Sequence, residues 1–267
     1  MADKITWSVF TKPWKMPLPE LARFVSSLGF AAVEFPVRPG YQVEPGNVGR
    51  GLPEAARILG DYGVKIASVA GPTDEATIAA CAEAGVPVIR IMASIPQGAN
   101  YLEAEAGWQR DFDALLPLLD RYGVTVGVQN HCDRFVTNAV GLRRLIEKYN
   151  PKHIAAVWDA AHEALCGGLP EYALDVVWSH LCMVNLKNAF WQRTNGPEAE
   201  HATWRHYWTS GRHGLASWPR VVSELKRRGY RGVICLTAEY SDASLVDRLI
   251  AEDFGFAKEL FAGGTAN

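Results

Sequence analysis

The chain has 267 residues and a formal net charge of −2, with its acidic and basic residues interleaved. A domain of this length buries enough surface to fold without a disulfide or a structural metal. There is no stripe of Lys and Arg that would follow a phosphate backbone, which argues against a nucleic-acid partner. Neither a run of eighteen apolar residues nor a basic segment followed by an apolar one is present, so we expect a cytoplasmic protein with no membrane partner.

The elements, in chain order, are separated by a recurring glycine. A helix-like segment ends in glycine and an apolar residue five times, at Gly29, Gly63, Gly85, Gly123 and Gly229. Glycine takes the left-handed conformation just past a helix end at little cost, so each pair predicts a helix-to-strand turn.

Short apolar runs that suit strands buried on both faces flank these helices. In chain order they are Ile5–Phe10, Ala31–Phe35, Lys65–Val69, Val88–Met92, Val124–Val128, Ile154–Trp158, Leu181–Leu186 and Gly232–Thr237. Eight alternations of strand and helix predict one α/β domain over residues 1–267, a (β/α)8 TIM barrel. A doubly wound open sheet is the alternative, but no G-x-G-x-x-G follows the first strand.

The longest segment without a predicted element, about 188–216, follows the seventh strand and is rich in Trp, His, Arg and Gly. Loops of this length in compact domains are commonly functional. Its aromatic content predicts an ordered lid or an interface. Packing across a homo-oligomer would suit such a loop, although the sequence does not define the oligomeric state.

Polar residues follow the last four predicted strands, at the end where barrel enzymes hold their active sites. They are Gln129 and His131 for the fifth strand, Asp159, His162 and Glu163 for the sixth, Asn185 and Lys187 for the seventh, and Glu239 for the eighth. Each one alone suits a helix cap or an ion pair. Four neighbouring strands that end in this way predict one small-molecule site.

Further polar and aromatic residues supply candidates for substrate binding. They are Lys12 and Trp14 after the first strand, Arg38 after the second, and Arg212 and His213 in the long loop. Glu34 and Arg90 lie inside apolar runs, where a buried ion pair is as good an interpretation as a substrate role. Cys132, one of five scattered cysteines without a C-x-x-C pair, is expected to pack as a reduced thiol rather than to act as a nucleophile.

Four motifs run through the second half of the chain. They are D-x-x-H at Asp159 and His162, the run Val184–Lys187, Gly211-Arg-His-Gly214 before a tryptophan-containing helix, and Gly-Tyr-Arg-Gly leading to Glu239. This order resembles the xylose isomerase-like TIM barrels, the superfamily of sugar phosphate isomerases and epimerases. The resemblance spans nearly the whole chain. It implies a divalent metal (Mn, Mg or Co) held by Glu, Asp, His and Glu from strands five to eight, and proton transfer next to a carbonyl.

Carried onto this chain, the implied metal ligands are Gln129, Asp159, Asn185 and Glu239, and two of them depart from the family's pattern. Gln129 stands where a glutamate belongs and Asn185 where a histidine belongs, and glutamine cannot accept a proton in a two-base epimerisation. Hard cations do accept amide oxygens, so a weakened all-oxygen site is one hypothesis.

A metal-free site is the other hypothesis. In it Lys187 polarises a carbonyl, His131 or His162 acts as the base, and Glu239 is their partner.

We therefore expect an isomerase, an epimerase or a dehydratase-type lyase that acts on a small sugar, keto-sugar or sugar acid. The alternative is a non-catalytic or subunit-assisting barrel that binds a sugar-like ligand after loss of the metal site. A phosphodiesterase is disfavoured, because the sequence has neither a multi-metal cluster of His and Glu nor a basic face.

Overall fold

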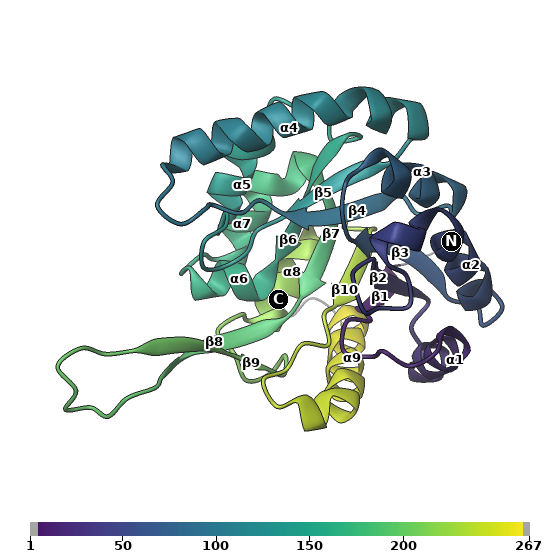
Figure 1. Ribbon diagram of the computed structural model, residues 1–267. Helices are drawn as coiled ribbons and strands as arrows, with labels where there is room; N and C mark the ends of the chain where they lie inside the picture. The colour runs from purple at the N-terminus through teal and green to yellow at the C-terminus, as the bar shows by residue number, and fades with distance from the viewer. Residues whose placement is uncertain (1–4, 264–267) are drawn as a thin grey trace.

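Eight parallel strands close into a barrel in the computed structural model, which describes residues 5–263 (Figure 1). The strands are β1 Thr6–Phe10, β2 Ala32–Pro36, β3 Lys65–Ala70, β4 Val88–Met92, β5 Thr125–Gln129, β6 Ile154–Asp159, β7 Leu181–Leu186 and β10 Val233–Leu236. Each pairs with the next around the ring, and β10 pairs with both β7 and β1. The predicted TIM barrel is confirmed. Residues 1–4 and 264–267, which the prediction placed in the same domain, lie outside the described residues.

Helices follow the strands and surround the barrel. They are α1 Leu18–Leu28, α2 Val48–Gly60, α3 Glu75–Glu83, α4 Tyr101–Tyr122, α5 Ala139–Ile146, α6 Ala160–Leu165, α7 Pro170–Val177, α8 Trp218–Arg227 and α9 Val246–Ala262, with 3-10 turns at Pro45–Asn47, Trp178–His180 and Ala243–Leu245. All five glycines predicted to end helices have positive φ, between 65° and 89°. None of the helices among residues 5–263 combines the length and the apolar composition needed to cross a membrane.

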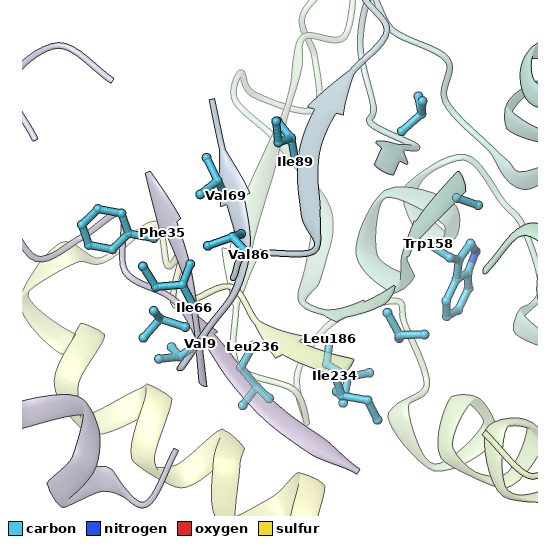
Figure 2. Packing of buried hydrophobic residues seen from close by; sticks show 14 of the residues in the cluster. Val9, Phe35, Ile66, Val69, Val86, Ile89, Trp158, Leu186, Ile234 and Leu236 are labelled. Atoms are coloured by element: carbon cyan, nitrogen blue, oxygen red, sulfur yellow. The ribbon is translucent and has the colours of Figure 1, made fainter. Parts of the chain in front are cut away.

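The main hydrophobic core lies between the barrel and its helices. Figure 2 shows part of it, with Val9 and Leu236 side by side on the paired strands β1 and β10. Alternate residues of the same strands face inward. They form a small apolar cluster inside the barrel, which includes Phe10, Val157 and Met183. The strands are therefore apolar on both faces until they approach the carboxyl end of the barrel, where polar side chains begin.

The segment 188–216, predicted as a long loop, contains two antiparallel strands, β8 Asn188–Arg193 and β9 Trp204–Thr209, which form a hairpin that projects from the barrel (Figure 1). Its base is fixed by the buried side chain of Asn188, which donates to the carbonyls of Gly211 and Ala216. A Cβ on Gly214 would lie 2.1 Å from the Asn188 oxygen, so the two segments are in close contact. The hairpin thereby holds Trp208 over the end of β7.

Candidate active site

A cavity of about 60 Å³ opens at the carboxyl ends of the barrel strands, where barrel enzymes hold their active sites. Side chains from most of the strands, or from the residues just after them, line it. The lining residues are Phe10, Lys12, Arg38, Arg90, Met92, Gln129, His131, His162, Asn185, Thr237 and Glu239. Seven of the residues singled out as catalytic, substrate-binding or metal-ligating candidates are among them. Two other candidates do not line the cavity but form hydrogen bonds with residues that do: Asp159 with Gln129, and Lys187 with Glu239.

Three predicted substrate-binding residues lie elsewhere. Trp14 is buried, and its indole N–H donates to Asp247 at 2.7 Å. Arg212 is exposed and pairs with Glu259 at 3.4 Å, and His213 is also exposed. Neither the position of Trp14 just after the first strand nor that of Arg212 and His213 in the long loop therefore brings these side chains to the cavity.

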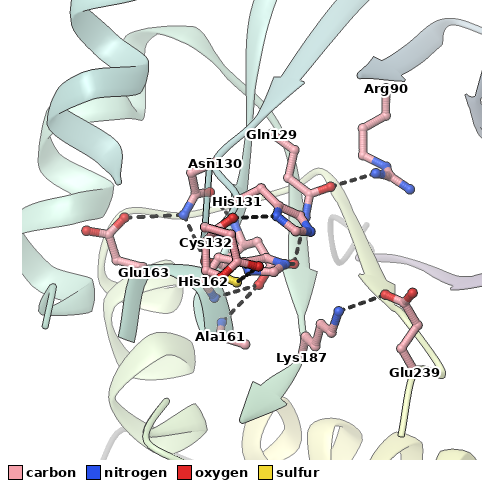
Figure 3. A network of polar contacts seen from close by, with 12 residues as sticks. Arg90, Gln129, Asn130, His131, Cys132, Ala161, His162, Glu163, Lys187 and Glu239 are labelled. Carbon is pink, nitrogen blue, oxygen red and sulfur yellow. Dashed lines mark hydrogen bonds and ion pairs between the residues drawn. The ribbon is translucent and has the colours of Figure 1, made fainter. Parts of the chain in front are cut away.

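A chain of hydrogen bonds crosses the floor of the cavity from β2 to β6, and Figure 3 shows the part that joins Arg90 to Gln129. The Arg90 guanidinium donates to both carboxylate oxygens of Glu34, at 2.6 and 3.0 Å, and to Oε1 of Gln129 at 2.7 Å. Gln129 in turn donates from Nε2 to Oδ2 of Asp159 at 2.9 Å. Glu34 and Arg90 thus form the buried ion pair that was one of their two interpretations, and Arg90 also reaches the cavity wall.

Asp159 ends β6 and begins α6, and both roles affect its charge. Its Oδ1 accepts from the backbone N–H of Ala161 at 2.9 Å and of His162 at 3.1 Å, which caps the helix. Burial raises the pKa of Asp159 to about 6, although the Lys187 ammonium opposes the rise. The D-x-x-H motif is thus a helix start in this fold, with its carboxylate fully buried.

Glu239 lies between two lysines. Its Oε2 accepts from Lys187 at 2.7 Å, and its Oε1 pairs with Lys12 at the cavity mouth. Burial would raise the pKa of Glu239, but the two ammonium groups outweigh it and lower the pKa below the ordinary value. Lys187 also lies 3.5 Å from the ring centre of Trp208, beneath the hairpin. The carboxylate therefore stays ionised and is a poor proton acceptor.

Two histidine rings lie side by side, with their centres 3.9 Å apart. A different ring nitrogen carries the proton in each of them. His131 Nδ1 lies 2.9 Å from the carbonyl of Cys132, which only accepts, so this nitrogen carries the proton and Nε2 is left as an acceptor. His162 Nδ1 accepts from the N–H of Cys132 at 3.1 Å, so its proton is on Nε2. Burial lowers the pKa of both rings, which keeps them neutral.

Cys132 provides both backbone contacts, and its thiol is inert. The side chain is buried, and burial raises the pKa of the thiol to about 12. A thiol that stays protonated at neutral pH is not a nucleophile. This geometry agrees with the packing role expected from the sequence.

The four residues implied as metal ligands do not fit a divalent cation. The Gln129 oxygen accepts from a guanidinium, and both oxygens of Glu239 pair with ammonium groups. The Asp159 carboxylate accepts from the Gln129 amide and from two backbone N–H groups. A cation placed among these donors would face Arg90 and Lys187, and like charges at such distances repel strongly in a buried site.

Two buried side chains at the cavity have polar atoms without a hydrogen-bond partner among residues 5–263. They are Asn185, through both Nδ2 and Oδ1, and His162, through Nε2. Both side chains are almost fully buried. Buried polar atoms are nearly always hydrogen-bonded in folded proteins, so these atoms indicate a polar ligand.

The sequence did not single out Phe10, Met92, Thr237 or Trp208 as site residues. Phe10 and Met92 end strands that were predicted correctly, and their inward parity with Gln129 was the available signal. Trp208 carried no signal of its own, because it reaches Lys187 only through the hairpin.

Solved structures with the same fold cover nearly the whole chain. A solved D-psicose 3-epimerase from Clostridium cellulolyticum H10, with D-tagatose, has a TM-score of 0.72 at 11% identity, covering 96% of this chain and 99% of its own. An E. coli 3-keto-D-glucoside 4-epimerase has a TM-score of 0.73 at 12% identity over 96% and 99%. A probable 3-DHS dehydratase of petrobactin synthesis from Bacillus anthracis has a TM-score of 0.73 at 12% identity over 97% and 100%.

These identities support a common fold and not a common substrate. No curated protein matches the chain by sequence. The family model described as xylose isomerase-like TIM barrel matches residues 22–260, nearly the full length. The chain belongs to the xylose isomerase-like TIM barrel family.

Proposed function

We propose that the protein is an enzyme that removes a proton from the carbon next to a carbonyl in a small sugar-like molecule, leading to isomerisation or elimination. Two of the similar structures are named as sugar epimerases and one as a dehydratase, and such reactions begin with this step. The observation that carries the proposal is the histidine pair, which presents an acceptor and a donor nitrogen at one cavity.

In the proposed step, Nε2 of His131 accepts the proton from the substrate carbon. The C–H electron pair moves into the adjacent carbon–carbon bond, and the carbonyl oxygen becomes an enolate oxygen. The Nε2–H of His162 donates to that oxygen, and the cation of Arg90 lies at the cavity wall to stabilise the charge. In an isomerisation the hydroxyl proton on the deprotonated carbon passes to the enolate oxygen, and His131 returns its proton to the former carbonyl carbon, so the carbonyl moves by one position. In an elimination His131 instead protonates a hydroxyl that leaves as water from the next carbon.

Glu239 and Lys187 have supporting roles in this scheme. The lysine pairs with the carboxylate and the Trp208 ring instead of lining the cavity. Because Glu239 is a weak base, the geometry favours single-base chemistry over the two-base epimerisation of the family. The proposed chemistry uses no metal, since the expected donors are already engaged by cations and N–H groups.

Deuterium exchange provides the test. The protein is incubated in D2O with ketoses, keto-inositols, oxidised glycosides and sugar acids, and incorporation at carbon is followed by proton NMR. We expect exchange in at least one substrate and a loss of roughly 100-fold or more in His131→Gln, which is typical for a missing general base. His201→Gln, at an exposed position on the hairpin, is the matched control and should retain the wild-type rate.

A second candidate is a non-catalytic barrel that binds a sugar-like ligand. The two positions where the family resemblance implies an acid and a base support this candidate, because neither residue is free to accept a proton. Gln129 accepts from Arg90, and Glu239 pairs with two lysines. If the wild-type protein binds members of the substrate panel but exchanges none of them, this candidate replaces the proposed enzyme.

A further inference from the structure

Positive charge exceeds negative charge around the cavity. The cations are Lys12, Arg38, Arg90 and Lys187, and the carboxyl groups are Glu34, Asp159 and Glu239. Four cations against three anions leave one positive charge even when every carboxyl group is ionised. A small site with an excess of one sign attracts ligands of the other sign.

The pairing within the site locates this excess at Arg38. Arg90 is neutralised by Glu34, and the two lysines share Glu239. The Arg38 guanidinium has no hydrogen bond or ion pair with any residue from 5 to 263. It is half-buried at the cavity, 5.8 Å from the ring centre of Phe10. Burial and the nearby Arg90 charge lower the pKa of Arg38, and the carboxylates of Glu34 and Glu239 oppose this only in part, since neither forms an ion pair with it.

The inner end of the cavity contains buried polar atoms without a hydrogen-bond partner. The Asn185 side chain offers an unpartnered donor and an unpartnered acceptor, and His162 offers one further unpartnered nitrogen. Hydroxyl and carbonyl oxygens satisfy such atoms, whereas a purely apolar ligand does not. These buried atoms are independent of the charge at Arg38 and also indicate a polar ligand.

We propose that the ligand of this site is a small hydroxy- or oxo-carboxylic acid, whose carboxylate pairs with Arg38 and whose hydroxyl or carbonyl oxygens bind Asn185 and His162. A guanidinium is well suited to a carboxylate, because its fork of N–H donors matches both oxygens. A cavity of about 60 Å³ limits the enclosed part of the ligand to a few heavy atoms. Such an acid would be the substrate of the proposed proton transfer. Only its role as a substrate rests on the proposed function, because binding itself needs no catalysis.

Binding measurements test the proposal without any turnover. Isothermal titration calorimetry compares acids with their uncharged counterparts: D-glycerate with glycerol, D-gluconate with D-glucitol, and D-glucuronate with D-glucose. We expect at least one acid to bind tenfold or more tightly than its neutral partner, and the preference to weaken as salt increases. In Arg38→Gln the preference should fall by roughly tenfold, as for a lost charge-assisted hydrogen bond.

Two further variants separate a charge effect from a folding effect. Arg38→Lys keeps the charge without the fork and should retain part of the preference. Arg23→Gln removes an exposed arginine on α1, outside the cavity, and should leave binding unchanged. Equal affinity for acids and neutral partners, a preference that survives Arg38→Gln, or no binding of any acid would each overturn the inference. Exchange into neutral sugars alone would overturn it while leaving the proposed enzyme intact.

Discussion

At the scale of single residues, Gln129 stands where the resemblance to the family implies a glutamate. Its amide joins two charged groups, since the oxygen accepts from Arg90 and the nitrogen donates to Asp159. A glutamate at this position would place two carboxylates within hydrogen-bond distance, and such pairs favour sharing a proton or binding a cation. The amide therefore suits a floor held together by hydrogen bonds instead of by a metal.

The double variant Gln129→Glu/Asn185→His gives the chain the Glu, Asp, His and Glu set that its resemblance to the family implies. We expect manganese to stabilise it, by about 2.7 kcal/mol at 100 times its Kd. Wild-type protein should show no manganese-dependent change in thermal midpoint. Gln97→Glu adds the same charge at an exposed site and controls for non-specific binding. Manganese-dependent stabilisation of the wild-type protein that EDTA reverses would contradict the metal-free interpretation of the site.

The sequence located several of these residues but not their partnerships. Gln129, Asn185 and Glu239 were visible because polar residues stand out where an apolar strand ends. That Arg90 reaches Gln129 depends on the spacing between two strands, and strand-end patterns do not report it. The different protonated nitrogens of His131 and His162 depend on the two backbone groups of Cys132, and only the folded chain defines those contacts.

At the scale of secondary-structure elements, β5 shows how closely the barrel interior constrains the sequence. Gly127 faces inward, and a Cβ there would lie 2.7 Å from Cγ2 of Val157 and 3.1 Å from Cγ1 of Val88. Real Cβ atoms do not approach carbon this closely, and overpacking of a buried site costs about 1–3 kcal/mol. Glycine is therefore required two residues before Gln129 to let β5 pack against β4 and β6.

We expect Gly127→Ala to lower the free energy of unfolding by about 1–3 kcal/mol in urea denaturation. Val157→Ala in the same chain should restore part of the loss, because it removes the clashing methyl groups. Gly255→Ala in α9 is the control, since no atom lies within 4 Å of the added Cβ, and it should stabilise the protein by about 0.5–1 kcal/mol. A Gly127→Ala protein as stable as the wild type would show that the strand shifts freely.

Among the secondary-structure elements, the sequence predicted the barrel strands but not the hairpin of β8 and β9. Each barrel strand was predicted to within one or two residues of its observed bounds, because strand and helix alternate and glycine marks the turns. The hairpin was missed since Arg, His and Gln are mixed with aromatic residues in β8 and β9, and the two strands are separated by residues 194–203, too far apart for the Asn195-Gly196 pair to mark a two-residue turn. Its pairing is therefore evident only in the folded chain.

At the scale of the whole molecule, buried ionisable groups connect stability to pH. Burial raises the pKa of Glu163 from its ordinary 4.5 to about 7, despite the N–H of Ala139 that it accepts at 2.8 Å. Burial also raises the pKa of Asp253, to about 6. In each case the folded protein binds a proton that the unfolded chain has already released, so stability increases as pH falls through the raised pKa. The histidines act oppositely: they stay neutral in the folded protein, so stability falls as the unfolded chain takes up their protons around and below the ordinary pKa of 6.5.

The difference between the wild type and a Glu163 variant from pH 8 to pH 6.5 therefore isolates Glu163. Proton binding by Glu163 should add about 1 kcal/mol to the unfolding free energy across this range, by linkage at one site, and the two histidines offset much of it in the wild-type protein. Glu163→Gln keeps an acceptor for Ala139 and cannot titrate, so its unfolding free energy relative to the wild type should fall by about 1 kcal/mol from pH 8 to pH 6.5. Glu200→Gln, at an exposed position, should behave as the wild type does. Urea denaturation of the three proteins at both pH values measures the difference, and an unchanged pH dependence in Glu163→Gln would assign the effect to another group.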